Sequence, residues 1–299
     1  GYSNSFKYDG ANRLIKTINA QNKETWRYYD TEDNLTKVID RQDSTLTNNT
    51  RVKQYTYDNL DRLTKEADNY NAIVSSTYDQ VGNLLTKTDQ MSRTTNYTYD
   101  DFNRLISETD PASNITKFTY DKANNRLSIT YPDNKITNYT YNQINKLLTI
   151  TDTLNNVRTF TYDVLGNKLT EKDKRGYTTS FQYNNLNRLT QETNPQGTIT
   201  AYTYDNNNNR LTETMNNSRV TSYQYDELNH TTKIIRPGNV IESFTYDSNS
   251  NVKTKINGNS QTITYTYDSL DRVVNKQLPT SETSVSYTYD NWNNLTNLV

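Results

Sequence analysis

The residues of this chain that could do chemistry are carboxylates recurring at a fixed spacing. A tyrosine is followed by Asp in twelve of fourteen repeated markers, and Asn142 and Asn184 fill the other two. A row of carboxylates could hold hard cations or exchange protons, but Asn would lose that charge. A turn in which the side chain binds its own backbone works with either residue. The repeat therefore predicts structural Asx turns and no metal site.

Other chemical groups are scarce. His230 is the only histidine, and the chain has no cysteine, which excludes disulfides and thiolate metal sites. A lone His without a partner base gives no nucleophilic triad, so we expect His230 to be a solvated side chain where a loop meets a strand. The sequence predicts no catalytic residue, no cofactor site and no metal site, and hence no enzyme.

Composition favours a thin sheet over a layered core. Hydrophobic residues make up 31% of the 299 residues, yet 26 are tyrosine. Mean hydropathy is −1.03, which alone would suggest disorder, but Tyr and Thr favour strands. A net charge of −1 without a basic stripe argues against nucleic-acid binding, and no apolar stretch is long enough to span a membrane.

The elements that carry the markers repeat along the whole chain. From Tyr57 to Tyr267 the markers recur every 21 residues. The regular marker tyrosines are Tyr57, Tyr78, Tyr99, Tyr120, Tyr141, Tyr162, Tyr183, Tyr204, Tyr225, Tyr246 and Tyr267, with outlying markers at Tyr8, Tyr29 and Tyr289. A sustained period of this length is typical of a repeat architecture.

Each unit is predicted to be a β-hairpin. Residues 115–120 alternate with period two, which places Phe118 and Tyr120 on one face and Lys117 and Thr119 on the other. Turn residues follow, and a second short strand covers residues 104–109 in the preceding unit. The fold class is therefore all-β, with tandem hairpins of about 21 residues forming one long antiparallel sheet.

Neighbouring hairpins should be joined by rows of side chains. Equivalent tyrosines lie two strands apart, about 9.6 Å, so the strand between them must fill the gap. A recurrent leucine is the candidate: Leu63, Leu84, Leu105, Leu127, Leu147, Leu169, Leu189 and Leu211. We expect alternating Tyr and Leu rows to supply most of the cohesion. Trp292 occupies a position where many units carry Leu, so we expect it to pack.

The array is predicted to be a single domain over residues 1–299, with about fourteen units and no cap at either end. The step from Tyr29 to Tyr57 is 28 residues, which indicates a lengthened loop near 41–52. About 28 strands exceed what an open twisted sheet usually holds, so the array should wind into a spiral, hollow shell or tube. Open edges need further repeats, caps or copies of the chain as partners.

The markers resemble those of the Rhs or YD-repeat family. Tyr78 to Leu84 and Tyr162 to Leu169 match its Tyr-Asp, Gly-Asn-Leu pattern, although Asn replaces Gly at most turns, as in Asn103, Asn145 and Asn187. The resemblance implies a spiralling sheet around a hollow shell, as in bacterial insecticidal and polymorphic toxins, where it encloses a toxic segment, and in teneurins. It also implies a secreted or cell-surface location.

Three functions follow as alternatives. The first is a non-enzymatic wall segment of a hollow shell whose parent protein encloses a polypeptide. The second is an extracellular filament or tube in which copies continue the sheet. The third is an adhesion or carbohydrate-binding module, because exposed aromatic rows could stack on glycans.

Overall fold

The computed structural model describes residues 3–41, 50–70, 73–279 and 284–299. These residues contain 28 β-strands and no helix, and therefore no helix that could span a bilayer. The chain divides into two compact units, Gly1–Phe118 with Val285–Val299, and Thr119–Ser284. Paired strands run antiparallel in both units, which confirms the predicted all-β class of tandem hairpins.

The first unit contains strands from both ends of the chain. They are β1 (Asn4–Tyr8), β2 (Leu14–Ile18), β3 (Glu24–Tyr29), β4 (Leu35–Arg41), β5 (Thr50–Tyr57), β6 (Leu63–Asp68), β7 (Ile73–Tyr78), β8 (Leu84–Thr88), β9 (Thr94–Tyr99), β10 (Leu105–Thr109), β27 (Val285–Tyr289) and β28 (Leu295–Leu298). Strand β11 (Ile115–Tyr120) carries the boundary between the units.

The second unit continues the same pattern. Its strands are β12 (Arg126–Thr130), β13 (Ile136–Tyr141), β14 (Leu147–Thr151), β15 (Val157–Tyr162), β16 (Lys168–Lys172), β17 (Thr178–Tyr183), β18 (Leu189–Thr193), β19 (Ile199–Tyr204), β20 (Arg210–Met215), β21 (Arg219–Tyr225), β22 (Thr231–Arg236), β23 (Val240–Tyr246), β24 (Val252–Ile256), β25 (Thr262–Tyr267) and β26 (Val273–Gln277).

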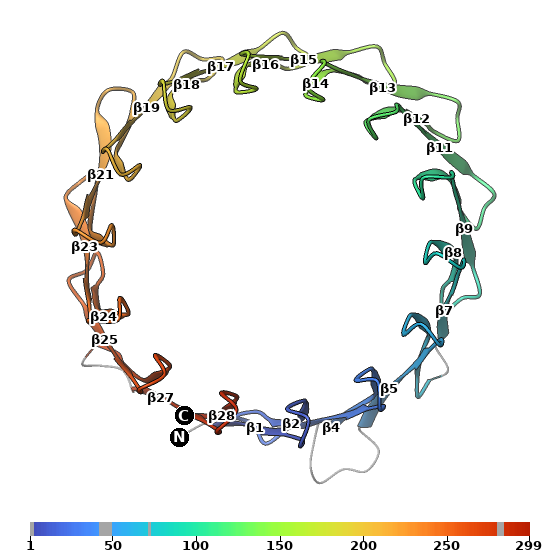
Figure 1. Ribbon diagram of the computed structural model, residues 1–299, viewed down its shortest axis with the longest axis horizontal. Helices are drawn as coiled ribbons and strands as arrows, with labels where there is room; N and C mark the ends of the chain where they lie inside the picture. The colour runs from blue at the N-terminus through green and yellow to red at the C-terminus, as the bar shows by residue number, and fades with distance from the viewer. Residues whose placement is uncertain (1–2, 42–49, 71–72, 280–283) are drawn as a thin grey trace. The chain divides into compact units, whose positions relative to one another are not determined.

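Each marker tyrosine ends one strand, and a short turn leads into the next strand beside it (Figure 1). We call this the marker turn, and the turn at the other end of the strands the opposite turn. In the hairpin of β17 and β18, Tyr183 pairs with Leu189 and Gln182 with Gln191, so Thr190 is left over as a β-bulge. The same one-residue shift recurs next to other marker tyrosines along the chain. The marker turns of one unit therefore all lie at the same end of its strands.

Both kinds of turn need a residue in the left-handed region. The residue four places after the marker tyrosine has positive φ, as in Asn103, Asn145, Asn187 and Asn208, at 58° to 70°. Asn tolerates this conformation better than most residues because its short side chain binds locally. The predicted use of Asn in place of Gly is confirmed at these turns, whereas Gly82 and Gly166 fill the same position in their own units.

This backbone requirement gives a testable expectation at Ser250, where φ is 70°. A β-branched residue there meets the left-handed clash, so Ser250→Val should destabilise the hairpin by about 1–2 kcal/mol. Ser250→Gly should be neutral or stabilising, because Gly adopts positive φ freely. Amide hydrogen exchange in β23 and β24 measures the effect.

The matched control is Ser248→Val, in the same turn but outside the residues with positive φ. We expect it to leave exchange nearly unchanged. Equal losses from both valine substitutions would contradict the conformational explanation.

The sheet has almost no buried interior. Among the described residues only Phe160 and Thr137 are buried, at 9% and 8% exposed. In β11 the even residues, including Phe118 and Tyr120, are half-buried and the odd ones are exposed, as the alternation predicts. One face therefore carries the aromatic side chains, and the other carries polar side chains open to solvent.

The first and last strands lie beside each other in the first unit. Asn4 pairs with Leu298 and Ser5 with Asn297, and the neighbouring hairpins continue from there. In this chain β28 thus pairs with the outer side of β1. Further repeats, caps or other copies as partners of the ends remain a prediction.

Two predictions about chain organisation stay open. The lengthened loop near 41–52 falls mainly on residues 42–49, which lie outside the described residues. At its margins Arg41 pairs with Thr50 and Ile39 with Val52, so part of the insertion extends strands β4 and β5. The single array over residues 1–299 also remains a prediction.

Candidate functional site

The repeated aspartates build the marker turns. Asp163 Oδ1 accepts hydrogen bonds from the backbone amides of Leu165 at 2.9 Å and Asn167 at 2.8 Å. Its other oxygen, Oδ2, accepts from the Asn167 side chain at 2.8 Å. The carboxylate therefore satisfies donors that the tight turn leaves without strand partners.

Asn142 and Asn184 make the same backbone contacts. Asn142 Oδ1 accepts from the amides of Ile144 and Lys146, at 3.1 and 2.8 Å, and Asn184 Oδ1 accepts from those of Leu186 and Arg188. The predicted Asx-turn role of the repeated residue is thus confirmed by its hydrogen bonds. Within the part of the chain that the structure describes, no group of three or more His, Cys, Asp or Glu residues is placed to hold a metal ion.

The marker turn gives a second mutational prediction. Asp163→Ala leaves two turn amides without their acceptor, whereas Asp163→Asn keeps an acceptor oxygen, as Asn142 does naturally. We expect the alanine variant to speed exchange of the Leu165 and Asn167 amides by roughly tenfold, which is typical of losing a capping side chain. The asparagine variant should stay within about threefold of wild type at neutral pH. Equal acceleration by both variants would show that the turn does not depend on the Asx contact.

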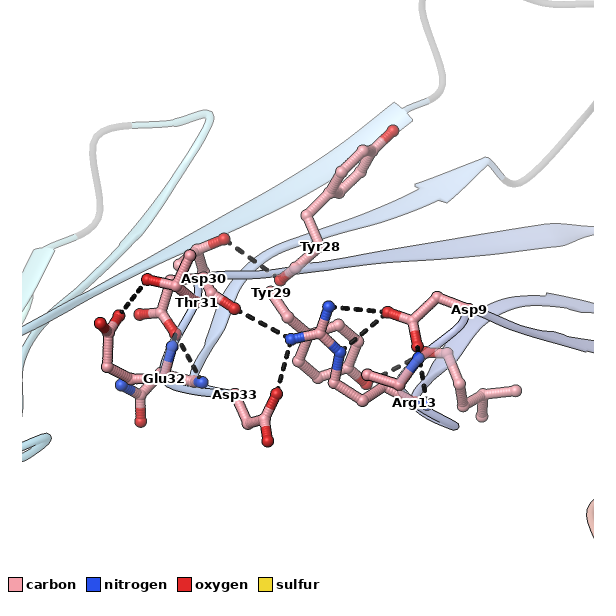
Figure 2. A network of polar contacts seen from close by, with 12 residues as sticks. Asp9, Arg13, Tyr28, Tyr29, Asp30, Thr31, Glu32 and Asp33 are labelled. Atoms are coloured by element: carbon pink, nitrogen blue, oxygen red, sulfur yellow. Dashed lines mark hydrogen bonds and ion pairs between the residues drawn. The ribbon is translucent and has the colours of Figure 1, made fainter. Parts of the chain in front are cut away.

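The residue four places after the aspartate connects one marker turn to the next. Figure 2 shows Arg13 between two turns: Nε donates to Asp9 Oδ2 at 2.8 Å, and Nη1 donates to the Asp30 carbonyl at 2.9 Å and reaches Asp33 at 2.7 Å. Its guanidinium also lies 4.9 Å from the centre of the Tyr29 ring. One side chain thus donates hydrogen bonds to its own turn and to the next turn, and it also contacts the next marker ring.

Arg62 and Arg188 make the same contacts with the next marker turn and its tyrosine. Each donates to the backbone carbonyl of the next marker aspartate, Asp79 at 2.6 Å and Asp205 at 2.8 Å, and lies over the next marker tyrosine. Where the position is Asn, the amide reaches the positive-φ residue of the next turn. Such pairs are Asn34–Asp61, Asn83–Asn103, Asn125–Asn145, Asn167–Asn187, Asn209–Asn229 and Asn251–Asp271.

His230 occupies the same position and makes the same kinds of contact. Its Nδ1 is 2.9 Å from Asp226 Oδ2, and its ring stacks on the marker ring of Tyr246 with centroids 4.6 Å apart. The expectation of a merely solvated side chain was wrong, because the ring is held between two hairpins. Its contacts assign it a structural role.

The marker tyrosines join neighbouring hairpins through their hydroxyl groups. Tyr204 Oη donates to the carbonyl of Leu189, in the preceding hairpin, at 2.8 Å. Further marker tyrosines make the equivalent bond at 2.8 to 3.1 Å, among them Tyr8 to Leu295, Tyr29 to Leu14, Tyr57 to Leu35, Tyr78 to Leu63, Tyr141 to Arg126, Tyr183 to Lys168, Tyr225 to Arg210, Tyr246 to Thr231 and Tyr267 to Val252. Burial raises the pKa of several of these hydroxyls, including Tyr57 and Tyr246.

The eight predicted leucines occupy two positions of the repeat. Five lie opposite their marker tyrosine in the strand register: Leu63, Leu84, Leu105, Leu147 and Leu189. Leu169 and Leu211 come one residue later, at the bulge, because Lys168 and Arg210 hold the opposite position. Leu127 likewise follows Arg126, whose carbonyl accepts from Tyr141. The marker tyrosines that donate therefore all meet a backbone carbonyl, whereas a leucine side chain is present at only some of these positions.

The two faces of the sheet differ in chemistry. On the aromatic face, Arg158 lies 5.2 Å from the Phe160 ring centre, Lys168 lies 4.6 Å from that of Phe181, and both cations pair with Glu171. On the other face, hydroxyl pairs at 2.6 to 3.0 Å bridge the hairpin strands: Thr77–Thr86, Thr119–Ser128, Thr140–Thr149, Thr161–Thr170, Thr203–Thr212, Thr245–Thr254 and Thr288–Thr296.

The tips of the marker turns carry a repeated feature that the sequence reasoning missed. Trp292 lies at the tip of its marker turn and is 72% exposed, so the expectation that it packs was wrong. The leucines that share its repeat position, such as Leu165 and Leu228, are exposed as well. The signal was visible as a large apolar residue three places after most marker tyrosines, inside an otherwise polar turn.

Family models of known proteins match this repeat. The model for the Teneurin YD-shell matches residues 112–299, well over half of the chain. The RHS repeat model matches residues 8–45 and 78–115. No curated protein matches the chain.

Solved structures of Tc toxin components are similar to the chain. The crystal structure of TcdB2-TccC3-Cdc42 is 15% identical, with 98% of this chain and 22% of that chain covered and a TM-score of 0.46. A Photorhabdus luminescens Tc holotoxin pore is 18% identical, with 99% and 21% covered and a TM-score of 0.44. The chain spans about a fifth of the length of these relatives.

Proposed function

The chain belongs to the Teneurin YD-shell family, and on that premise we propose that it is a non-enzymatic scaffold, a wall segment of a hollow β-shell in a secreted or cell-surface protein. The observation that carries the proposal is the phenol-to-carbonyl bond, repeated from hairpin to hairpin in the same phase. A wall needs lateral contacts between neighbouring hairpins. This bond supplies them, together with the Arg or Asn side-chain bond beside it.

The parent protein is proposed to enclose a polypeptide behind this wall. Support comes from the family and from the chemistry of the repeated groups, which hold one hairpin to the next. Asp carboxylates accept turn amides, tyrosine hydroxyls donate to carbonyls, and His230 is bonded and stacked. A surface built in this way serves as a barrier.

Protease protection of the full-length secreted protein tests this function. Proteinase K followed by mass spectrometry should leave the array and any enclosed segment intact together at neutral pH. An acid-unfolded sample is the control, and in it the protease should cleave the array and the enclosed segment at the same time. Cleavage within β-strands of the native array, or early loss of a second segment while the array persists, would contradict the enclosure.

A filament is the second candidate, because a filament would use between copies the contact that joins β28 to β1 within this chain. Tyr8 donates to the Leu295 carbonyl at 3.1 Å, the same contact that joins consecutive hairpins, and Asn294 reaches Asn12 as Asn83 reaches Asn103. The last hairpin therefore presents the surface that the first hairpin accepts. Negative-stain microscopy separates the candidates: particles of fixed size support the shell, and uniform filaments support the polymer.

A further inference from the structure

The aromatic face of strands β20–β26 carries more cations than carboxylates. These strands lie within the unit of residues 119–284, and their register and alternation assign the charged side chains to this face. We call the set the cationic patch; its cations and then its carboxylates are Arg210, Arg219, Arg236, Lys255 and Lys276, with Glu213 and Glu242. The other face of the same strands has no carboxylate and carries Lys233, with Lys253 at a bulge.

The carboxylates of the cationic patch are less exposed than the cations that they pair with. Arg236 and Lys255 both pair with Glu242, whose side chain is 19% exposed against 43% and 37% for the two cations. Arg210 pairs with Glu213 at 3.1 Å and is 40% exposed against 34% for the glutamate. Arg219 is exposed as well. The patch therefore presents an excess of positive charge to solvent.

Glu242 shows how the patch receives a carboxylate. It pairs with a guanidinium and an ammonium group that come from β22 and β24, the strands on either side of its own. Guanidinium and ammonium groups carry more N–H donors than one carboxylate uses. A further carboxylate from a partner can therefore bind on the exposed sides of Arg236 and Lys255.

Rings of the patch are covered by the protein's own cations. The Arg210 guanidinium lies 4.9 Å from the centre of the Tyr223 ring and donates to its hydroxyl at 2.8 Å. The Lys255 ammonium lies 5.6 Å from the centre of the Phe244 ring. Single-stranded nucleic acids bind such surfaces by stacking bases on open rings, whereas a carboxylate needs only the cations. These contacts favour an acidic polypeptide over a ligand that stacks.

We propose that the cationic patch binds an acidic polypeptide segment in extended conformation, laid across strands β20–β26. The strand spacing of about 4.8 Å gives the patch a width of roughly 29 Å, which about nine extended residues span. Every second side chain of such a segment points toward the sheet, so its carboxylates meet the cations of successive strands. Charge-assisted hydrogen bonds to Arg and Lys then hold the segment.

The marker carboxylates of these hairpins are engaged elsewhere. Oδ1 of Asp226, Asp247 and Asp268 accepts the backbone amide two residues further on, at 2.9 to 3.0 Å. Each of these carboxylates is thus held against its own turn, at the marker end of the strands. The cations within the strands are left to pair with a partner.

Fluorescence anisotropy with the full chain tests the proposal independently of the wall function, because a shell and a filament carry the same face. The probe is a labelled peptide of about twelve residues in which Glu alternates with Ser. We expect saturable binding that weakens as salt rises, and no binding of the same peptide with Gln in place of Glu. No saturation below about 1 mM, equal binding of the Gln peptide, or tighter binding of a single-stranded oligothymidylate of similar length would overturn the proposal.

Substitutions on the two faces give the matched comparison. Arg236→Gln with Lys255→Gln removes two cations from the patch and should weaken binding of the Glu peptide by about tenfold. Lys172→Gln with Lys233→Gln removes the same charge from the other face of the same unit and should change binding by less than about twofold. An equal loss in both pairs would contradict binding at the patch.

Glu242→Gln guards against a variant that loses binding because it folds poorly. It removes the carboxylate that Arg236 and Lys255 share and leaves both cations to the peptide. Binding of the Glu peptide should therefore tighten by about threefold, a change that a folding defect does not produce. Amide exchange in β22–β24 verifies that each variant is folded. Unchanged or weaker binding by a folded Glu242→Gln variant would overturn the proposal.

Discussion

Replacing Tyr204 by alanine should destabilise its two neighbouring hairpins by about 3 kcal/mol. The substitution removes the half-buried ring, its hydroxyl bond to the Leu189 carbonyl and the surface on which Arg188 lies at 4.8 Å. Tyr204→Phe keeps the ring and loses only the hydroxyl bond, so about 1 kcal/mol is expected. Because repeat arrays open locally, amide exchange in β18 through β21 is the appropriate measurement.

The matched control is Tyr177→Ala. Tyr177 lies in an opposite turn and is 52% exposed, and its removal should cost less than about 0.5 kcal/mol. If Tyr177→Ala opened the hairpins as much as Tyr204→Ala, the marker tyrosines would not be the principal contacts between hairpins. If Tyr204→Phe matched wild type, the hydroxyl bond would contribute nothing.

Acidification should unfold the array through its turn aspartates. A hydrogen bond from the neighbouring Arg or Asn side chain lowers the pKa of Asp9, Asp58, Asp89, Asp100, Asp110, Asp152, Asp163, Asp205 and Asp268. A carboxylate whose pKa is lower in the folded state stabilises that state when both states are ionised. This stabilisation is complete above the ordinary Asp pKa of about 3.9 and is lost as pH falls through the lowered values.

Thermal unfolding followed by circular dichroism measures this dependence. The midpoint should be nearly constant from about pH 7 to about pH 5 and should fall steeply below about pH 4. Substituting Asn for Asp58, Asp100, Asp163 and Asp205 together should flatten the acid limb, because Asn142 shows that an amide makes the same turn without titrating. A midpoint unchanged down to about pH 3, or an equally steep limb in the variant, would contradict the role of these carboxylates.

The hairpin fold was predictable because each local signal agrees with the others. Alternation in residues 115–120, the turn residues after Tyr120 and the 21-residue period all specify the same strand and turn boundaries. The Asx role of the repeated Asp was predictable from the exchange with Asn142 and Asn184. These inferences depend on short-range geometry, which a single sequence contains.

The contacts between hairpins were predicted less well. Counting leucines overlooked the bulge, which shifts Leu127, Leu169 and Leu211 by one residue from the position opposite the tyrosine. The hydroxyl bond from Tyr204 to a backbone carbonyl has no sequence signature, because any residue supplies that acceptor. His230 and Trp292 were both misplaced, since burial at a turn depends on the neighbouring hairpin, which the pattern of a single repeat does not include. The carbohydrate-binding alternative stays a prediction that a glycan array can test.

Hydrogen exchange along the whole chain tests most directly whether in-phase hairpins form one laterally bonded wall. Protection should rise and fall with a 21-residue period from Tyr57 to Tyr267, high in the strands on both sides of each marker and low at turn residues such as Val164 and Glu227. Tyr204→Ala should lower protection in its own and the adjacent hairpins alone. Protection without this period, or loss that spreads evenly over all hairpins, would contradict a wall held together by contacts between neighbouring hairpins.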